Sequence, residues 1–149
     1  MKYDYGSWHY EGDGFPRDSP QEYGAIHIGL FLKWCLLRGF AGRVPLDDWP
    51  EELAAVLAGK MSGTAFVVEC LGEQLSSEDL NEEGNRFAEV YYGPKGNYLL
   101  DLDGKFGNLI YRAPESAYDF SQFSAVVDAR FAGRLPDLTP PRKRWFGLF

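Results

Sequence analysis

The feature that most constrains the fold is a continuous apolar run from Ala25 to Phe40. Ser19-Pro20 supplies an N-cap and a first-turn proline, and Gly39 supplies a C-terminal stop, so we predict a helix over about 20–38. Apolar side chains cover most of the circumference of this helix, which is typical of burial on all sides. The run contains two basic residues and is shorter than the ~20 residues that cross a bilayer. We therefore expect a central buried helix and no stable membrane association.

Helical spacing and capping residues predict three more helices, over about 50–58, 76–92 and 121–132. The segment from Thr64 to Leu71 fits either a helix or a strand, because it is rich in β-branched residues. Two strands are predicted at Asn97–Leu102 and Gly107–Arg112, and Asp103-Gly104 between them is turn chemistry. The expected fold class is α+β: a helix-dominated single domain with a central buried helix and a small antiparallel hairpin or sheet.

Composition bounds the organisation of the chain. With 149 residues, 45% of them hydrophobic, one core is the default, and we expect a single globular domain over residues 1–135. Residues 136–149 form a proline-rich, basic-aromatic tail that we expect to pack on the domain. Cys35 and Cys70 lie in apolar surroundings and are predicted to be reduced core residues. The first residues lack a secretory signal, so the expected location is the cytoplasm.

Both histidines, His9 and His27, lie in the first forty residues, which makes this corner the only one available for imidazole chemistry. His9, Glu11 and Asp13 alternate, so on an extended segment they would point to one side, with His27 as a further ligand. Their spacing matches no established metal pattern, and the alternative is that they are solvated loop residues. For His27 the favoured state is a buried neutral imidazole, hydrogen-bonded to the loop that contains Trp8. In that interpretation the five residues form a structural motif, and no metal or cofactor is expected.

The same residues carry a resemblance. Trp8-His9-Tyr10-Glu11-Gly12-Asp13 and the helix after it are similar to the WHYEGDFP-like opening and AxTHIGMFLAW-like helix of a family of small bacterial proteins of uncharacterised function. The resemblance covers mainly residues 3–39, and the chain departs from it at Gly14, an extra residue, and at Ile26, where the family tends to have Thr. Proteins similar to this one look like those encoded beside contact-delivered toxins. The resemblance therefore implies an immunity-type protein.

Charge is distributed unevenly along the chain. The formal net charge is −7, which argues against direct nucleic-acid binding, and residues 47–83 contain ten acids and one base, Lys60. An anionic face of this kind attracts a basic partner, whereas the alternative is a solvated surface with helix-capping acids. The predicted partner-binding residues are Asp47, Asp48, Glu51, Glu52, Glu78, Asp79, Glu82 and Glu83.

Two functions follow from these observations. Signatures of nucleophilic catalysis and of phosphate binding are missing, so the first hypothesis is a binding protein rather than an enzyme. It is a cytoplasmic immunity-type protein whose acidic face occludes a cognate cationic toxin, for example a nuclease. The alternative is a small metal-dependent or acid-base enzyme that uses His9, Glu11, Asp13 and His27. An enzyme should bring these four side chains together at an accessible pocket, whereas an inhibitor should bury His27.

Overall fold

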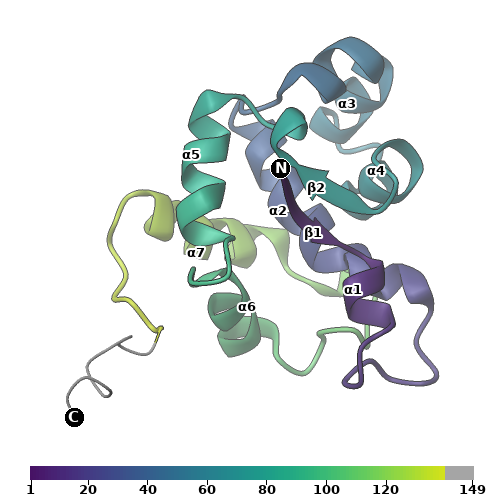
Figure 1. Ribbon diagram of the computed structural model, residues 1–149, viewed down its shortest axis with the longest axis vertical. Helices are drawn as coiled ribbons and strands as arrows, with labels where there is room; N and C mark the ends of the chain where they lie inside the picture. Colours follow the sequence, from purple (N-terminus) through teal and green to yellow (C-terminus); the bar gives the residue numbers. More distant parts are fainter. Residues whose placement is uncertain (140–149) are drawn as a thin grey trace.

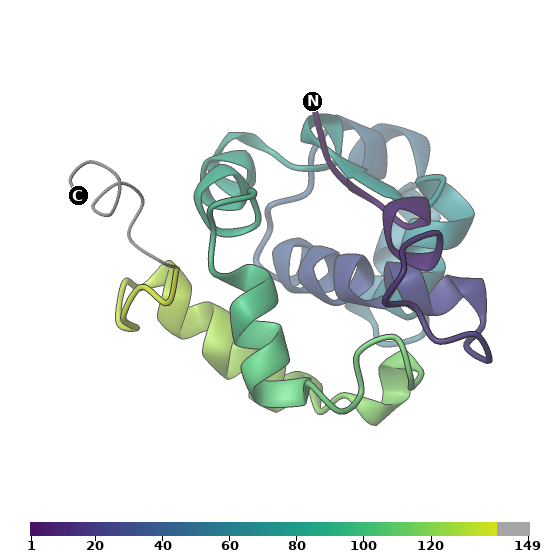
Figure 2. The same cartoon turned by 60° about the horizontal axis from the view of Figure 1, so that its bottom comes forward.

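The computed structural model describes residues 1–139 of the chain. It is a mostly helical single domain with one two-stranded antiparallel sheet, as the predicted fold class requires. Helix α2 runs through the middle, and the other helices surround it (Figures 1 and 2). In chain order the helices and strands are β1 (Lys2–Tyr5), α1 (Ser7–Tyr10), α2 (Ile26–Leu37), α3 (Pro50–Leu57), α4 (Gly63–Cys70), β2 (Gln74–Ser76), α5 (Glu82–Tyr91), α6 (Tyr98–Phe106) and α7 (Phe120–Phe131).

Short helical turns connect several of these elements. They are η1 (Gln21–Ala25), η2 (Val44–Asp48), η3 (Ser77–Asp79) and η4 (Glu115–Ala117). The predicted helix over 20–38 is therefore a 3-10 turn followed by α2, and ten of the twelve residues of α2 are buried. The expectation of a central buried helix is confirmed.

The ambiguous segment 64–71 is helix α4, which crosses α2 at very short range. A Cβ atom built on Gly29 would lie 2.4 Å from the backbone nitrogen of Thr64, and one built on Gly63 would lie 2.0 Å from the carbonyl oxygen of Gly29. Only residues without a side chain allow the two backbones to approach so closely. Packing on α2 thus outweighs the β-propensity of this segment.

The predicted hairpin is wrong, because residues 98–106 form helix α6. Tyr98, Leu102 and Phe106 follow at intervals of four and are buried, while Asp103 and Gly104 lie inside the helix instead of at a turn. Residues 107–112 form turns that follow this helix. The apolar pattern of this stretch fits both periods over a short window, and packing against α7 selects the helix.

The sheet forms elsewhere, between the first residues of the chain and a short strand after α4. In β1 and β2, Lys2 pairs with Ser76, Asp4 with Leu75 and Tyr5 with Gln74. The predicted helix over 76–92 is interrupted because Leu80 is extended. Its first turn is η3, and α5 begins only at Glu82.

The two other predicted helices are confirmed as α3 and α7. Cys35 and Cys70 are free thiols; Cys35 is buried and Cys70 is half-buried. Within residues 1–139 no helix has the length and apolar content needed to cross a membrane. Leu138 donates its backbone N–H to Asn97 at 2.7 Å, so the start of the predicted tail lies against α6. The remainder of that tail, 140–149, lies outside the described residues.

Candidate functional site

Three polar side chains from three separate elements meet beneath the surface of the domain. Asp4 comes from β1, His9 from α1 and His27 from α2. One carboxylate oxygen of Asp4 lies 2.7 Å from His9 Nε2, and the other lies 2.8 Å from His27 Nε2. The two Nε2 atoms are 3.0 Å apart. We refer to these three residues as the Asp-His-His cluster.

Local folding explains why these residues meet. Asp4 is the one buried residue of β1, because strand pairing turns its side chain towards α2. Helix α1 can lie close to η1 because Gly24 has no side chain, and a Cβ atom there would be 3.0 Å from the carbonyl oxygen of Gly6 and 3.4 Å from the Cβ of His9. This close contact places the His9 ring over His27, with ring centroids 4.1 Å apart.

Tyrosine hydroxyls surround the cluster. Tyr92 donates to the Asp4 oxygen that also contacts His27, and the Tyr111 hydroxyl lies 2.5 Å from His9 Nδ1. Tyr111 holds a positive φ of 62°, a conformation that non-glycine residues adopt rarely and at some cost. Tyr98 donates to the backbone carbonyl of His27 at 2.5 Å.

The charge state follows from these contacts. Burial alone would raise the pKa of Asp4, but the hydrogen bonds from His27 and His9 outweigh it and hold that pKa well below its usual range. Burial lowers the pKa of His27, so this imidazole is neutral at pH 7. With Asp4 as an anion, the neutral His27 ring donates its Nε2 hydrogen to one carboxylate oxygen, and Nε2 of His9 faces the other. The Nδ1 atom of His27 is buried and has no partner among the described residues.

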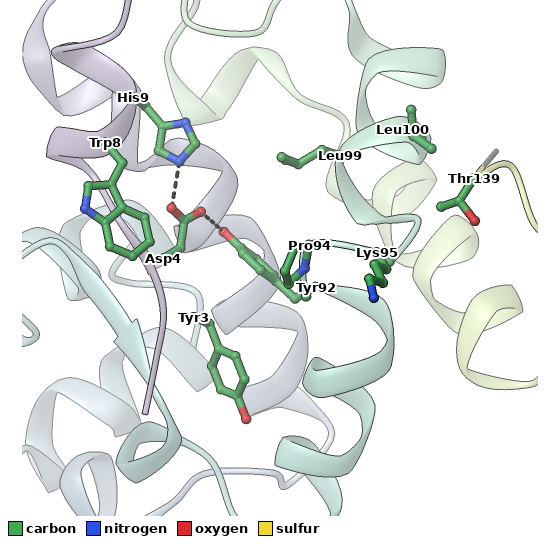
Figure 3. A pocket seen from close by; sticks show the side chains of 12 residues that line it. Tyr3, Asp4, Trp8, His9, Tyr92, Pro94, Lys95, Leu99, Leu100 and Thr139 are labelled. Carbon is green, nitrogen blue, oxygen red and sulfur yellow. Dashed lines mark hydrogen bonds and ion pairs between the residues drawn. The ribbon is translucent and has the colours of Figure 1, made fainter. Parts of the chain in front are cut away.

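The cluster borders a cavity of about 570 Å³. Asp4 and His9 lie at one wall, with Tyr92 beside Asp4, and Figure 3 shows Leu99 and Lys95 across from them. The side chain of His9 is 14% exposed and that of Asp4 is 6% exposed, so the cavity reaches the cluster through these two residues. The cavity wall is otherwise mostly aromatic and aliphatic: Tyr3, Trp8, Pro94 and Leu100, together with Gly93, Gly96 and Thr139.

The predicted motif residues therefore separate into two groups. His9 and His27 come together, and the expected burial of His27 is confirmed. Glu11 and Asp13 are exposed and do not join them, because residues 7–10 are helical rather than extended. The sequence offers Glu11 or Asp13 as a partner of His27 or of the helix N-terminus, but the acid that bonds to His27 is Asp4. Trp8 is 57% exposed at the mouth of the cavity.

The predicted acidic face is only partly present. Asp79 is buried, where its carboxylate accepts from the backbone N–H of Ser76 at 2.7 Å, so its assignment to a partner-binding surface is wrong. Arg43 forms ion pairs with both Glu78 and Asp48, and Glu82 pairs with Arg86. The exposed members of the set are Asp47, Asp48, Glu51, Glu78, Glu82 and Glu83, and Glu52 is half-buried.

Sequence reasoning missed Asp4, Tyr92 and Tyr111. Asp4 sits between Tyr3 and Tyr5 in a segment that alternates like a strand, and an acid in such a segment beside two histidines was a signal that could have been used. Tyr92 and Tyr111 gave no signal, because their contact with the cluster depends on how α5 and the 107–112 turns pack.

Fold and site together define a small helical domain with a buried carboxylate and two imidazoles beside an open cavity. The chain belongs to the family described as a domain of unknown function, DUF7832, which it matches over residues 2–115. The matched range includes the whole Asp-His-His cluster and both tyrosines that bond to it, and ends before α7. No curated protein and no solved structure matches the chain.

Proposed function

We propose that the protein is a small enzyme whose active centre is the Asp-His-His cluster. The observation that carries this proposal is the convergence of Asp4, His9 and His27 at the wall of a cavity of about 570 Å³. Cavities of roughly 300–1,000 Å³ accommodate small molecules, and convergent polar groups in an otherwise apolar wall are typical of active sites. Lys95 at the cavity favours a substrate with an anionic group.

Burial of the Asp-His-His cluster lowers the stability of the fold, which supports a role for these residues beyond packing. Asp4 is a charged group with 4% of its surface exposed, and His27 leaves one ring nitrogen without a partner among the described residues. An unpaired buried polar atom costs about 1–3 kcal/mol, and apolar residues of similar size would avoid that cost. Residues kept at such a cost are candidates for acid-base or metal-assisted chemistry.

In this proposal Asp4 orients both imidazoles and supplies negative charge, and His9 is the group that meets the substrate. His27 is a positioning residue, because it is buried and does not line the cavity but bonds to Asp4. Tyr92 lines the cavity with its ring and positions Asp4 through its hydroxyl. The hydroxyl of Tyr111 bonds to the other ring nitrogen of His9, Nδ1, and so fixes the orientation of the ring.

Metabolite profiling tests the proposal and identifies the substrate in one experiment. The purified full chain is incubated with a bacterial metabolite extract supplemented with divalent metal ions, and consumed and formed compounds are identified by mass spectrometry. We expect at least one compound to be converted by the wild type and by Asp13→Asn, an exposed control on the same loop, but not by His9→Asn. Conversion that persists in folded His9→Asn, or no conversion by the wild type, would contradict an active centre at this cluster.

A second candidate is the immunity-type protein that occludes a cationic toxin. It is favoured by the ion pairs of Arg43, which join Asp48 of η2 to Glu78 of η3 and so bring two acidic stretches to one side of the domain. Exposed carboxylates on that side would pair with basic residues of the toxin and speed association.

This candidate is tested with the toxin encoded beside the gene. Charge reversal of Glu78, Glu82 and Glu83 should slow complex formation in surface plasmon resonance, and the effect should shrink at high salt. The double variant His9→Asn/His27→Asn should protect as well as the wild type if it keeps its melting temperature. Loss of protection in the folded double variant would contradict the immunity function and support the enzyme.

A further inference from the structure

We infer that Asp4, His9 and His27 bind one divalent transition-metal ion as three adjacent ligands. One donor atom from each residue can be chosen so that all three lie within 4.8 Å of one another. The inference names a cofactor for the centre described above, and it rests on the proposed function for what the ion would do there. Binding of the ion itself can be measured independently.

The donor set indicates the class of ion. Two imidazole nitrogens and one carboxylate suit iron, manganese, cobalt, nickel or zinc, whereas magnesium and calcium prefer sites made of oxygen. Two histidines and one carboxylate are also the ligands of non-haem iron sites that keep open positions. Asp4 lies on β1, which pairs with β2, and His9 lies on α1, which packs against β1 and against η1, the turn that leads into α2 and His27. The three residues are therefore held by helices and a strand and not by a loop.

The spacing indicates the geometry. For bonds of about 2.1 Å, two donors 3.0 Å apart subtend about 90° at the metal, while tetrahedral ligands would be about 3.4 Å apart. The two Nε2 atoms are separated by 3.0 Å, which matches two neighbouring corners of an octahedron. Nε2 of His9 lies 2.7 Å from one oxygen of Asp4 and Nε2 of His27 lies 2.8 Å from the other, so the carboxylate lies beside both nitrogens and an oxygen of it would take a third corner. Three further positions would then remain for water or substrate.

Outer contacts fit a ligand role. An imidazole that binds a metal through Nε2 carries its hydrogen on Nδ1, and the Tyr111 oxygen, 2.5 Å from Nδ1 of His9, is placed to accept it. Tyr92 and the backbone N–H of Tyr5 bond to the two oxygens of Asp4 and fix the plane of the carboxylate.

The ion would also be accessible. Asp4 and His9 line the cavity, whereas His27 lies behind them. The open coordination positions therefore face the cavity, where a substrate group could replace a bound water. Lys95 lies on the same cavity and could hold an anionic part of that substrate.

The test is a titration of the full chain with Co²⁺ alone, after chelator treatment and dialysis, followed by calorimetry and visible absorption. We expect one ion per chain and the weak absorption bands of a five- or six-coordinate ion. Asp13→Asn, the matched control, should bind like the wild type. His9→Asn should bind more than about 100-fold more weakly, and Tyr111→Phe, which keeps all three ligands, about 10-fold or more.

Each outcome decides a separate point. The metal site is overturned if the wild type binds no Co²⁺. It is also overturned if His9→Asn and Tyr111→Phe are folded and bind Co²⁺ as tightly as the wild type. The intense bands of tetrahedral cobalt overturn the octahedral arrangement. Compound conversion by metal-free protein overturns the metal inference and leaves the proposed enzyme standing. If the cluster binds the metal but no metabolite is converted, the proposed function is overturned and the metal site stands.

Discussion

Asp79 connects the fold to a measurable pH dependence. Burial, offset in part by hydrogen bonds from Ser76, raises the pKa of Asp79 to about 6 from an ordinary value of 3.8. Between these two values the folded chain holds the proton more tightly than the unfolded chain, so the free energy of unfolding falls as the pH rises. A shift of about two units corresponds to about 3 kcal/mol. The protonated Asp79 therefore stabilises the fold fully below pH 3.8, and this stabilisation is lost as the pH rises above about 6.

The variant Asp79→Asn isolates this effect, because its side-chain oxygen can still accept from Ser76 but cannot ionise. We expect the stability of the variant relative to the wild type to increase by about 2.5 kcal/mol between pH 4 and pH 8, since part of the difference has already developed at pH 4. Urea unfolding followed by tryptophan fluorescence measures it at each pH. Glu83→Gln, an exposed control, should show no such trend. A relative stability of Asp79→Asn that stays constant across this range would refute the reasoning.

Other predictions concern packing and buried pairs. Gly29→Ala places a Cβ atom 2.4 Å from the backbone of α4, so we expect a loss of about 1–3 kcal/mol or more in urea unfolding; a loss below about 0.5 kcal/mol would contradict the close crossing. Asp101 and Arg130 pair at 2.6 Å with both side chains less than a tenth exposed. Asp101→Leu alone should therefore destabilise by about 3 kcal/mol, and much of this should be recovered in the double variant with Arg130→Met. Tyr92→Phe removes a bond to the charged Asp4 and should lower the free energy of unfolding by about 1.5–3 kcal/mol, with unchanged circular dichroism.

How much of this fold could be predicted differs from element to element. Helix α2 was predictable because its apolar run is long and bracketed by a proline and a glycine. The 98–106 segment was not, because its apolar residues fit both a strand and a helix over a short window. Its state depends on contacts with α7, which begins only at Phe120. The pairing of β1 with β2 is similarly non-local, since it joins residue 2 to residue 76.

The candidate site was half predictable. Two histidines are rare enough to be noticed, and the buried state of His27 follows from its place on an apolar helix. The alternation of His9, Glu11 and Asp13 would place these two acids on the same side as His9 only if the segment were extended. Residues 7–10 instead form a helical turn, which leaves both acids in solvent and turns His9 towards Asp4. The direction in which each side chain points determines which residues form the site, and a sequence motif does not contain this information.

The central claim is that the working part of this protein is the Asp-His-His cluster. Anomalous diffraction from crystals grown with Co²⁺ tests it most directly, because the position of the ion is located without reference to any assay. The account predicts one strong peak about 2.1 Å from Nε2 of His9, Nε2 of His27 and an oxygen of Asp4. A difference map whose peaks lie only on exposed carboxylates such as Glu51 or Glu83, with none at the cluster, would contradict it.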